Sequence, residues 1–280
     1  MPTLKQALLA AQKSLYGIAE NPDLEAAMLL CHLLEKPKSH LYAWPEAMLS
    51  ESQHQHFQQL IQRRQQGTPI AYILQQREFW SLALRVTPDT LIPRAESELL
   101  VERALHHLEG YRNPIAADLG TGSGAIALAL ASERPDASVF ATDLQQAALS
   151  IAKENAQQLG LQNLLFHAGD WCAALPEGEE FDLIFSNPPY IEAADPHLTQ
   201  GDLPYEPRSA LVSGEDGLDD IRTIIKQAPT RLKQNGWLIL EHGYNQADAV
   251  RRLMQSAGMS GITSHTDLAG QPRVTEGCCS

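Results

Sequence analysis

The sequence predicts an α/β protein in which a mainly parallel sheet follows a small helical domain and a linking β-hairpin. The first 66 residues carry apolar side chains at helical spacing. From about residue 91 onward, short apolar runs alternate with helical stretches, which is typical of βαβ units. We therefore expect a helical domain at residues 1–67, a hairpin linker at 68–90 and an α/β domain at 91–280.

Helix signals follow one another in the N-terminal part. Apolar residues three or four positions apart predict a first helix: Leu4, Ala7, Leu8, Ala11 and Leu15. Asn21 and Pro22 are typical of an N-cap and of the first helical position, so a second helix begins there. Ser50 and Gln53 form a capping-box pattern that begins a third helix, which ends near Gly67. These signals indicate packing and carry no chemistry.

Strands and helices alternate in the rest of the chain. Residues 68–86 alternate between polar and apolar enough to predict the strands of the hairpin. Further apolar runs predict five strands: Ile115–Leu119, Ser138–Thr142, Leu164–Ala168, Phe181–Ser186 and Trp237–Glu241. Helical stretches lie near Gly124–Ser132, Gln145–Leu159 and Leu218–Leu232. Ligands of such sheets bind outside the carboxyl ends of the strands, so the residues directly after each strand are the functional candidates.

The charge of the chain is unevenly distributed and disfavours nucleic acid as a partner. The net charge is −13, and the first 75 residues contain six basic and six acidic residues. The acid excess therefore falls entirely on the α/β part. Binding to a phosphate backbone depends on Lys and Arg, so we expect no binding to free DNA or RNA.

Composition also limits the cellular context. No apolar run approaches the ~20 residues of a membrane span, and the N-terminus lacks the pattern of a signal peptide. The four cysteines show no metal-ligand spacing. We expect a cytoplasmic, monomeric protein with reduced thiols, no membrane association and no metal site.

A glycine-rich segment, DLGTGSG at 118–124, follows the first strand of the predicted sheet. Glycines let the backbone turn sharply and approach a ligand closely. Asp143 ends the next strand, about 20 residues on, where it can accept hydrogen bonds from ribose hydroxyls. Gly120, Gly122 and Ala125 also fit a dinucleotide pattern, so a dehydrogenase stays open here. Asp118 favours a methyltransferase, because an acidic loop suits a sulfonium cation better than a pyrophosphate.

The segment NPPY at 187–190 ends the fourth strand and narrows the chemistry. A conjugated or amide nitrogen is a weak nucleophile, and gripping both of its N–H groups turns the remaining lone pair toward a methyl donor. The Asn187 side-chain oxygen and the Pro188 carbonyl are suited to accept those two protons. Pro188 and Pro189 fix φ, and Tyr190 offers a flat ring for stacking.

The chain resembles the release-factor glutamine N5-methyltransferases, the HemK/PrmC family, over nearly its whole length. The segments that carry the resemblance are REFWSL (77–82), LIPR (91–94) with Glu98, DLGTGSG (118–124), NPPYI (187–191), DPHL (195–198), Glu206-Pro207 with Ala210-Leu211, and RVT (273–275). Ala95-Glu96-Ser97 departs from the Pro-Asp-Thr usual in the family but keeps one acid and one hydroxyl. The last five residues also differ from the usual ending.

The resemblance implies a Rossmann-like class I methyltransferase domain that uses S-adenosyl-L-methionine and releases S-adenosyl-L-homocysteine. It implies a cofactor site formed by Gly120, Thr121, Gly122, Ser123, Gly124, Asp143, Trp171 and Asn187. Asn187, Pro188 and Tyr190 would be catalytic, and with Pro189 they would line the substrate pocket. The substrate would be the glutamine of the Gly-Gly-Gln motif in class 1 peptide chain release factors, which the helical domain would help to grip.

Three other functions remain open from the sequence. A ribosomal-protein glutamine N5-methyltransferase and a DNA adenine-N6 or cytosine-N4 methyltransferase would use the same NPPY grip. The DNA enzyme would need a basic cleft, which the acid excess disfavours. A binding protein that lost activity would not need intact glycines and Asn187. Asp182 and Glu241, at strand ends, are expected to satisfy backbone groups, and His242 is expected to be structural.

Overall fold

The computed structural model describes residues 1–279, and its contacts divide the chain into two compact units. The first unit contains Met1–Gln75 together with Thr199–Tyr205. The second contains Gln76–Leu198 and the residues from Glu206 onward. The sequence did not predict that residues 199–205 belong to the first unit. The boundaries expected at residues 67 and 90 remain a prediction.

Five helices form the first unit: α1 (Leu4–Leu15), α2 (Pro22–Leu34), α3 (Lys38–Ala43), α4 (Glu51–Gln65) and α5 (Ile70–Leu74). The helix starts expected from the sequence are confirmed. The Asn21 side chain caps α2 by accepting from the Leu24 N–H, and Ser50 and Gln53 form a complete capping box at α4. The apolar faces of these helices meet in a separate core that includes Leu15, Leu29 and Phe57.

The expectation of strands throughout residues 68–86 is wrong for its first part. Residues Ile70–Leu74 form the short helix α5, and only then follow the antiparallel strands β1 (Gln76–Phe79) and β2 (Leu82–Arg85). Pro69, whose fixed φ suits the position before a helix, precedes α5. Ala71, Tyr72 and Ile73 are all buried, so this stretch lacks the one-sided burial that the alternation suggested.

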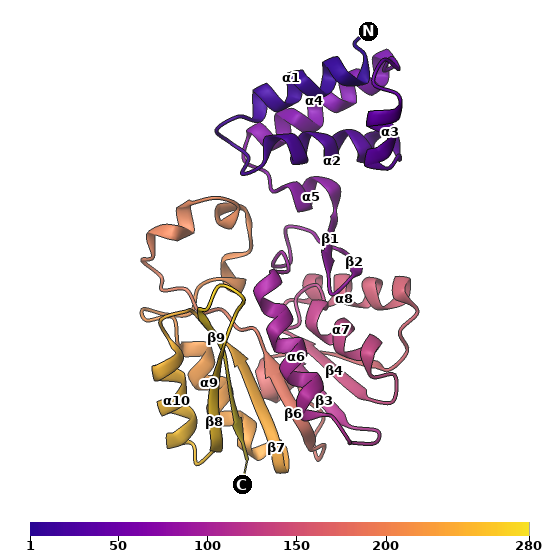
Figure 1. Cartoon of the computed structure of the whole chain (residues 1–280). Coiled ribbons are helices and arrows are strands. Elements are labelled where there is room, and N and C mark those ends of the chain that lie inside the picture. Colours follow the sequence, from indigo (N-terminus) through magenta and orange to yellow (C-terminus); the bar gives the residue numbers. More distant parts are fainter. Residues whose placement is uncertain (280) are drawn as a thin grey trace. The chain divides into compact units, whose positions relative to one another are not determined.

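A seven-stranded sheet in the order β5-β4-β3-β6-β7-β9-β8 forms the second unit (Figure 1). Its strands are β3 (Ile115–Leu119), β4 (Ser138–Asp143), β5 (Leu164–Ala168), β6 (Phe181–Ser186), β7 (Leu232–Glu241), β8 (Ser260–Thr266) and β9 (Pro272–Cys278). The first five are parallel, whereas β9 is antiparallel to both β7 and β8. The strand order reverses between β3 and β6, which makes their carboxyl ends a topological switch point.

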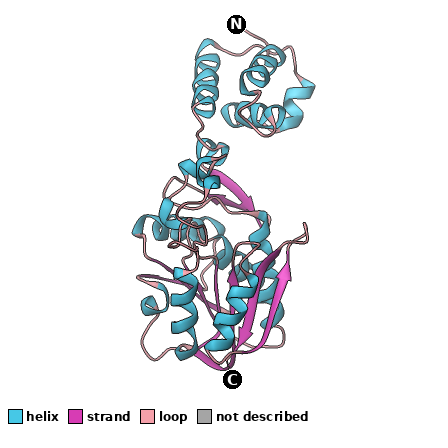
Figure 2. Cartoon of the chain, turned by 90° about the vertical axis from the view of Figure 1, so that its left-hand side faces the viewer, coloured by secondary structure: helices cyan, strands magenta, loops and turns pink. Residues whose placement is uncertain are grey.

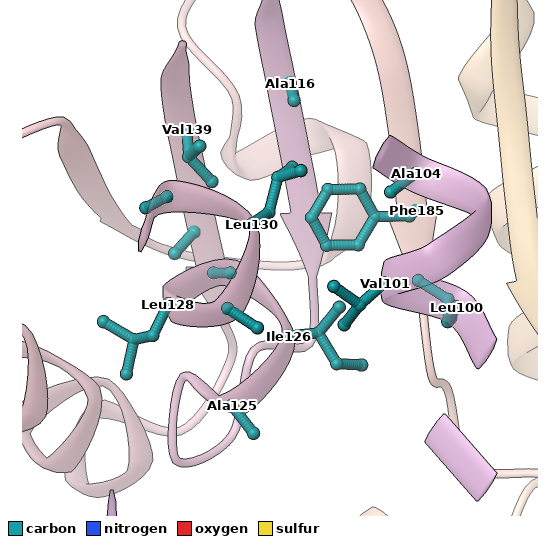
Figure 3. Packing of buried hydrophobic residues seen from close by; sticks show 14 of the residues in the cluster. Leu100, Val101, Ala104, Ala116, Ala125, Ile126, Leu128, Leu130, Val139 and Phe185 are labelled. Atoms are coloured by element: carbon teal, nitrogen blue, oxygen red, sulfur yellow. The ribbon is translucent and has the colours of Figure 1, made fainter. Parts of the chain in front are cut away.

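Helices cover both faces of this sheet (Figures 1 and 2). One face packs on α6 (Glu98–His107), α7 (Ala125–Glu133) and α8 (Gln146–Leu159), and the other on α9 (Asp219–Gln227) and α10 (Ala247–Ser256). Alternate residues of β6 enter the two cores: Phe185 packs with Val101 and Ile126 (Figure 3), while Ile184 packs on the opposite face. This double burial explains why the central strands, such as β3 and β6, are continuous apolar runs in the sequence.

Five elements near the C-terminus differ from the sequence expectation: α9, β7, α10, β8 and β9. Strand β7 begins at Leu232, five residues before the expected start. The helix expected to reach Leu232 ends at Gln227 and is followed by the short 3₁₀ helix η6 (Ala228–Thr230), because Pro229 cannot continue an α-helix. Helix α10 and strands β8 and β9 were not expected at all. Within residues 1–279, no helix combines the length and the apolar character needed to cross a membrane.

Candidate active site

The carboxyl ends of β3 and β6 are joined directly at the switch point. The Ser186 hydroxyl, at the end of β6, donates to the Leu119 carbonyl at the end of β3 over 2.6 Å. The Thr121 N–H in the glycine loop donates to the Thr142 carbonyl of β4 over 2.8 Å. The loops that follow these strands are therefore held side by side.

A cavity opens above these strand ends and collects most of the residues expected at the site. Its lining includes Gly120, Thr121, Gly122, Ser123, Asp143, Trp171, Asn187 and Pro189. Three expected residues, Gly124, Pro188 and Tyr190, are not among those that line it. The glycine loop and the NPPY motif thus share one cavity, although they are separated by more than sixty residues in the sequence.

Gly120 lies against Trp171 and leaves no room for a side chain. Its φ is +73°, and a Cβ atom at this position would lie 2.9 Å from Cζ3 of the Trp171 ring. Trp171 begins the 3₁₀ helix η2 (Trp171–Ala174) after β5 and has a positive φ of 39°. The turn conformation and the close approach both require glycine here.

Asp143 both shapes the glycine loop and lines the cavity. Its Oδ2 accepts from the Gly122 N–H and its Oδ1 from the Gln145 N–H, each over 2.8 Å. Burial raises the pKa of Asp143. Each carboxylate oxygen has a second lone pair, so the side chain keeps acceptor capacity toward the cavity.

Asp118 lies behind the loop and is almost fully buried. The Thr121 hydroxyl donates to its Oδ2 over 2.7 Å, whereas Oδ1 has no hydrogen-bond partner among residues 1–279. Burial raises the pKa of Asp118 to about 7. This carboxyl therefore braces Thr121 from behind the cavity wall.

Gly124 serves helix packing in this structure. It precedes α7 with a φ of +87°, and a Cβ atom there would lie 2.9 Å from Leu128 and 3.1 Å from the side chain of Ala152. Close contact between α7 and α8 therefore requires a glycine. A direct contact between Gly124 and a cofactor remains a prediction.

The carboxamide of Asn187 is anchored from behind. Its Nδ2 donates to the Oγ of Ser97 over 3.0 Å. Ser97 is buried and ends the 3₁₀ helix η1 (Ala95–Ser97), which precedes α6. Because Nδ2 is engaged there, Oδ1 is the end of the carboxamide that is left to accept a hydrogen bond from a ligand.

The Tyr190 end of the motif is held by the last residue of β7 and by the loop that follows it. The Tyr190 hydroxyl lies 3.4 Å from Oε1 of the buried Glu241, and its backbone carbonyl accepts from the Gln246 Nε2 over 3.0 Å. Burial, together with the charge of Glu241, raises the pKa of Tyr190. The expectation that Glu241 satisfies backbone groups is thus wrong, because its contacts are with side chains. The expectation holds for Asp182, which accepts from the Ile115 N–H over 2.8 Å.

Sequence reasoning about single residues missed Ser97, Gln246 and Glu206. The buried Glu206 accepts from the Ile92 N–H over 2.9 Å and pairs with Arg94. It thereby holds the segment after Pro207 against the segment 91–94, and both line the cavity. The spacing of these residues in the sequence gives no signal of such contacts. His242, expected to be structural, is buried and bonds the Gly243 carbonyl and Thr275.

The charges around the cavity suit a cation. Four aspartates line it, Asp89, Asp143, Asp170 and Asp220, against one arginine, Arg94, which pairs with Glu206. A sulfonium is attracted to such a lining, whereas a pyrophosphate would be repelled. Together with the close turn at Gly120, these residues fit S-adenosyl-L-methionine.

Comparison with known proteins identifies both parts of the chain. Residues 6–74 match the family model described as "PrmC N-terminal domain", and residues 115–272 match a "Methyltransferase domain". A release factor glutamine methyltransferase of Vibrio cholerae is 49% identical over 98% of this chain and 96% of its own length. One from Coxiella burnetii is 48% identical over 98% of both chains, and one from Pseudomonas aeruginosa 49% over 91% of both.

Solved structures of more distant proteins share the fold. A 16S rRNA N2 G1207 methyltransferase from Thermus thermophilus gives a TM-score of 0.55 at 20% identity and covers 73% of this chain and 50% of its own. A methyltransferase from Pyrococcus furiosus gives 0.52 at 15% identity and covers 71% and 89%. These likenesses confirm the class I methyltransferase fold. The near full-length identity to the relatives above goes further and shows that this chain belongs to the release factor glutamine methyltransferase family, which uses S-adenosyl-L-methionine.

Proposed function

We propose that this enzyme methylates the side-chain amide nitrogen, N5, of the glutamine in the Gly-Gly-Gln motif of class 1 peptide chain release factors. The observation that carries the proposal is the shared cavity, in which Asn187 faces the same space as the loop Gly120–Ser123. One motif supplies an acceptor for an amide N–H and the other a place for the methyl donor. The names of the close relatives support the same substrate class.

The residues of this chain act by orientation. A carboxamide nitrogen is a weak nucleophile, because its lone pair is delocalised. Asn187 Oδ1 accepts one N–H of the substrate amide and the Pro188 carbonyl accepts the other, so that the remaining lone pair is directed at the methyl donor. The rings of Pro188 and Pro189 fix φ and hold this corner rigid. Tyr190 does not line the cavity, and its proposed role is to offer an aromatic face to the planar amide and the developing positive charge once the substrate is bound.

The other residues of the cavity hold the cofactor. When bound, S-adenosyl-L-methionine supplies a methyl group on a positively charged sulfur. Gly120, Thr121, Gly122 and Ser123 would accommodate its methionine part through their backbone, Asp143 would accept from its ribose hydroxyls, and Trp171 would flank its adenine. Asn187 contacts both cofactor and substrate.

The remaining expectations concern partners and location. We propose that residues 1–67 help to recognise the release factor, whose size exceeds what a single side-chain pocket can hold. Because release factors act on ribosomes, the enzyme would work in the cytoplasm. The monomeric state and the lack of binding to free nucleic acid stay predictions.

Asn187→Ala tests the proposed function. Loss of one orienting acceptor lowers turnover by about 100-fold, because small errors of alignment have effects of that order. The assay measures transfer of a radiolabelled methyl group to a purified release factor, with mass spectrometry of the labelled peptide. A release factor with alanine in place of the motif glutamine should stay unlabelled. Turnover by Asn187→Ala near that of wild type would refute the role of Asn187.

A matched variant and alternative substrates complete the experiment. Asn113 is exposed and precedes β3, at the opposite edge of the sheet, so Asn113→Ala should keep wild-type turnover. Thermal unfolding of both variants shows whether either loses the fold. Labelling of duplex DNA without labelling of release factors would overturn the proposal, as would labelling of ribosomal proteins alone.

A further inference from the structure

One buried carboxyl lies behind both ends of the NPPY motif. Glu241, the last residue of β7, is 1% exposed, and its Oε1 lies 3.4 Å from the Tyr190 hydroxyl. The hydroxyl of Ser97 favours the ionised form of Glu241, whose Oε2 is buried and has no hydrogen-bond partner among residues 1–279. Ser97 in turn accepts from Asn187 over 3.0 Å. Ser97 therefore bonds to Asn187 and acts electrostatically on Glu241, which in turn bonds to Tyr190, so that residues far apart in the sequence are linked.

The donors and acceptors at Ser97 and Glu241 determine how the Asn187 carboxamide is oriented. An ionised carboxylate only accepts, and the unpartnered Oε2 of Glu241 is an acceptor toward which the single hydrogen of the Ser97 hydroxyl can turn. The lone pairs of Ser97 are then left to accept from Asn187, and only the Nδ2 end of that carboxamide can donate. Asn187 must present Oδ1 to the cavity. An asparagine turned by 180° would present a donor to the substrate amide, which also offers donors, and the grip would fail.

We propose that Ser97 and Glu241 are positioning residues that set the orientation of the Asn187 carboxamide and hold the Tyr190 hydroxyl during methyl transfer. This inference rests on the proposed function, since it assigns the two residues to the same glutamine site. Ser97 lines the cavity, and Glu241 acts through Ser97 and Tyr190.

The surroundings of Glu241 make the orientation sensitive to pH. Arg273 of β9 favours its ionised form, as do the hydroxyls of Ser97 and Tyr190, whereas Glu96 of η1 opposes it. Burial outweighs these and raises the pKa of Glu241 to about 7. A protonated Glu241 can donate to Ser97, whose hydrogen is then free to point at Asn187. Turnover should therefore fall as the pH decreases through about 7.

Three variants separate a positioning role from a structural one. Ser97→Ala removes the acceptor behind Asn187, and the loss of one hydrogen bond should lower kcat about tenfold, with KM for S-adenosyl-L-methionine within about twofold of wild type. Ser97→Thr keeps a hydroxyl and should retain most of the turnover. Glu241→Gln keeps the shape but can donate to Ser97, so kcat should fall and lose its dependence on pH between about 6 and 8. Glu102→Gln, an exposed glutamate of α6, is the control and should behave as wild type.

The outcomes are distinct for this inference and for the proposed function. The assay is methyl transfer to a release factor, with thermal unfolding of each variant alongside. Wild-type kcat in Ser97→Ala, or an unchanged pH profile in Glu241→Gln, would overturn the inference alone. It would also be overturned if kcat fell only in proportion to lost folded protein and Ser97→Thr gave no rescue. Wild-type enzyme that labels no release factor would overturn the proposed function and this inference together.

Discussion

The buried carboxyl of Asp118 predicts how the stability of this protein depends on pH. Asp118 is 1% exposed, and its Oδ1 has no hydrogen-bond partner among residues 1–279. Burial raises its pKa from 3.8 to about 7, although the hydrogen bond from Thr121 opposes the shift. Asp118→Asn has nearly the same shape but does not titrate. The variant therefore isolates the energetic effect of this ionisation.

The direction in which the free energy of unfolding changes with pH follows from proton binding. Between pH 4 and pH 7 the folded protein keeps a proton on Asp118 that the unfolded chain releases, so this stabilising effect is lost as pH rises through about 7. From about pH 5 to about pH 8 the loss amounts to about 2 to 3 kcal/mol for a shift of this size. The free energy of unfolding of Asp118→Asn, relative to wild type, should increase by that amount over the same range.

Urea unfolding at several pH values measures the difference. Other titrating groups, Glu241 among them, are common to both proteins and cancel in the comparison. Asp23→Asn replaces an exposed aspartate of α2 and should show a flat difference. A difference for Asp118→Asn that stays constant within about 0.5 kcal/mol would refute the argument, because it would mean that Asp118 ionises as freely in the folded protein as in the unfolded chain.

Three further changes test the cavity and the motif. Gly120→Ala should weaken binding of S-adenosyl-L-methionine about tenfold by calorimetry, because the new Cβ displaces Trp171; Gly178→Ala, with a similar φ of +79° but open space, should bind normally. Tyr190→Phe should keep more turnover than Tyr190→Ala if the ring matters more than the hydroxyl, and equal losses would contradict stacking. Gln246→Ala removes the donor to the Tyr190 carbonyl, and the loss of such a buried hydrogen bond costs about 1 kcal/mol of stability. The variant should therefore show a lower midpoint of thermal unfolding together with a lower kcat. An unchanged kcat would show that the Tyr190 backbone needs no such support.

Local patterns predicted the parallel strands well, for a physical reason. A strand buried on both faces must be apolar along its length, and Phe181–Ser186 shows this with residues entering both cores. The motif loops were predictable because parallel strands bring their carboxyl ends to one edge of the sheet. That rule alone is enough to predict that Asn187 and Gly120 lie at the same edge.

Other features depend on contacts that no local pattern encodes. Among the described residues, strand β8 (Ser260–Thr266) pairs with β9 alone, at the sheet edge, and is partly exposed, so it lacks an apolar run. Helix α5 is short, and its three consecutive buried residues, Ala71, Tyr72 and Ile73, form an apolar run that resembles a strand in the sequence. The link from Ser97 to Asn187 spans ninety positions, and a serine in that place has no distinguishing spacing. The long-range side-chain contacts at the site could therefore not be predicted from the sequence.

The cavity lining resolves an ambiguity that the glycine loop left open. The pattern of Gly120, Gly122 and Ala125 also fits a dinucleotide, whose pyrophosphate would need donors and positive charge nearby. The aspartates of the lining outnumber its single arginine, Arg94, which is already paired with Glu206. A doubly negative group here would meet repulsion at close range, whereas a sulfonium gains attraction from the same carboxylates. The charge of the cavity lining, more than the spacing of the glycines, therefore favours S-adenosyl-L-methionine over a dinucleotide in this protein.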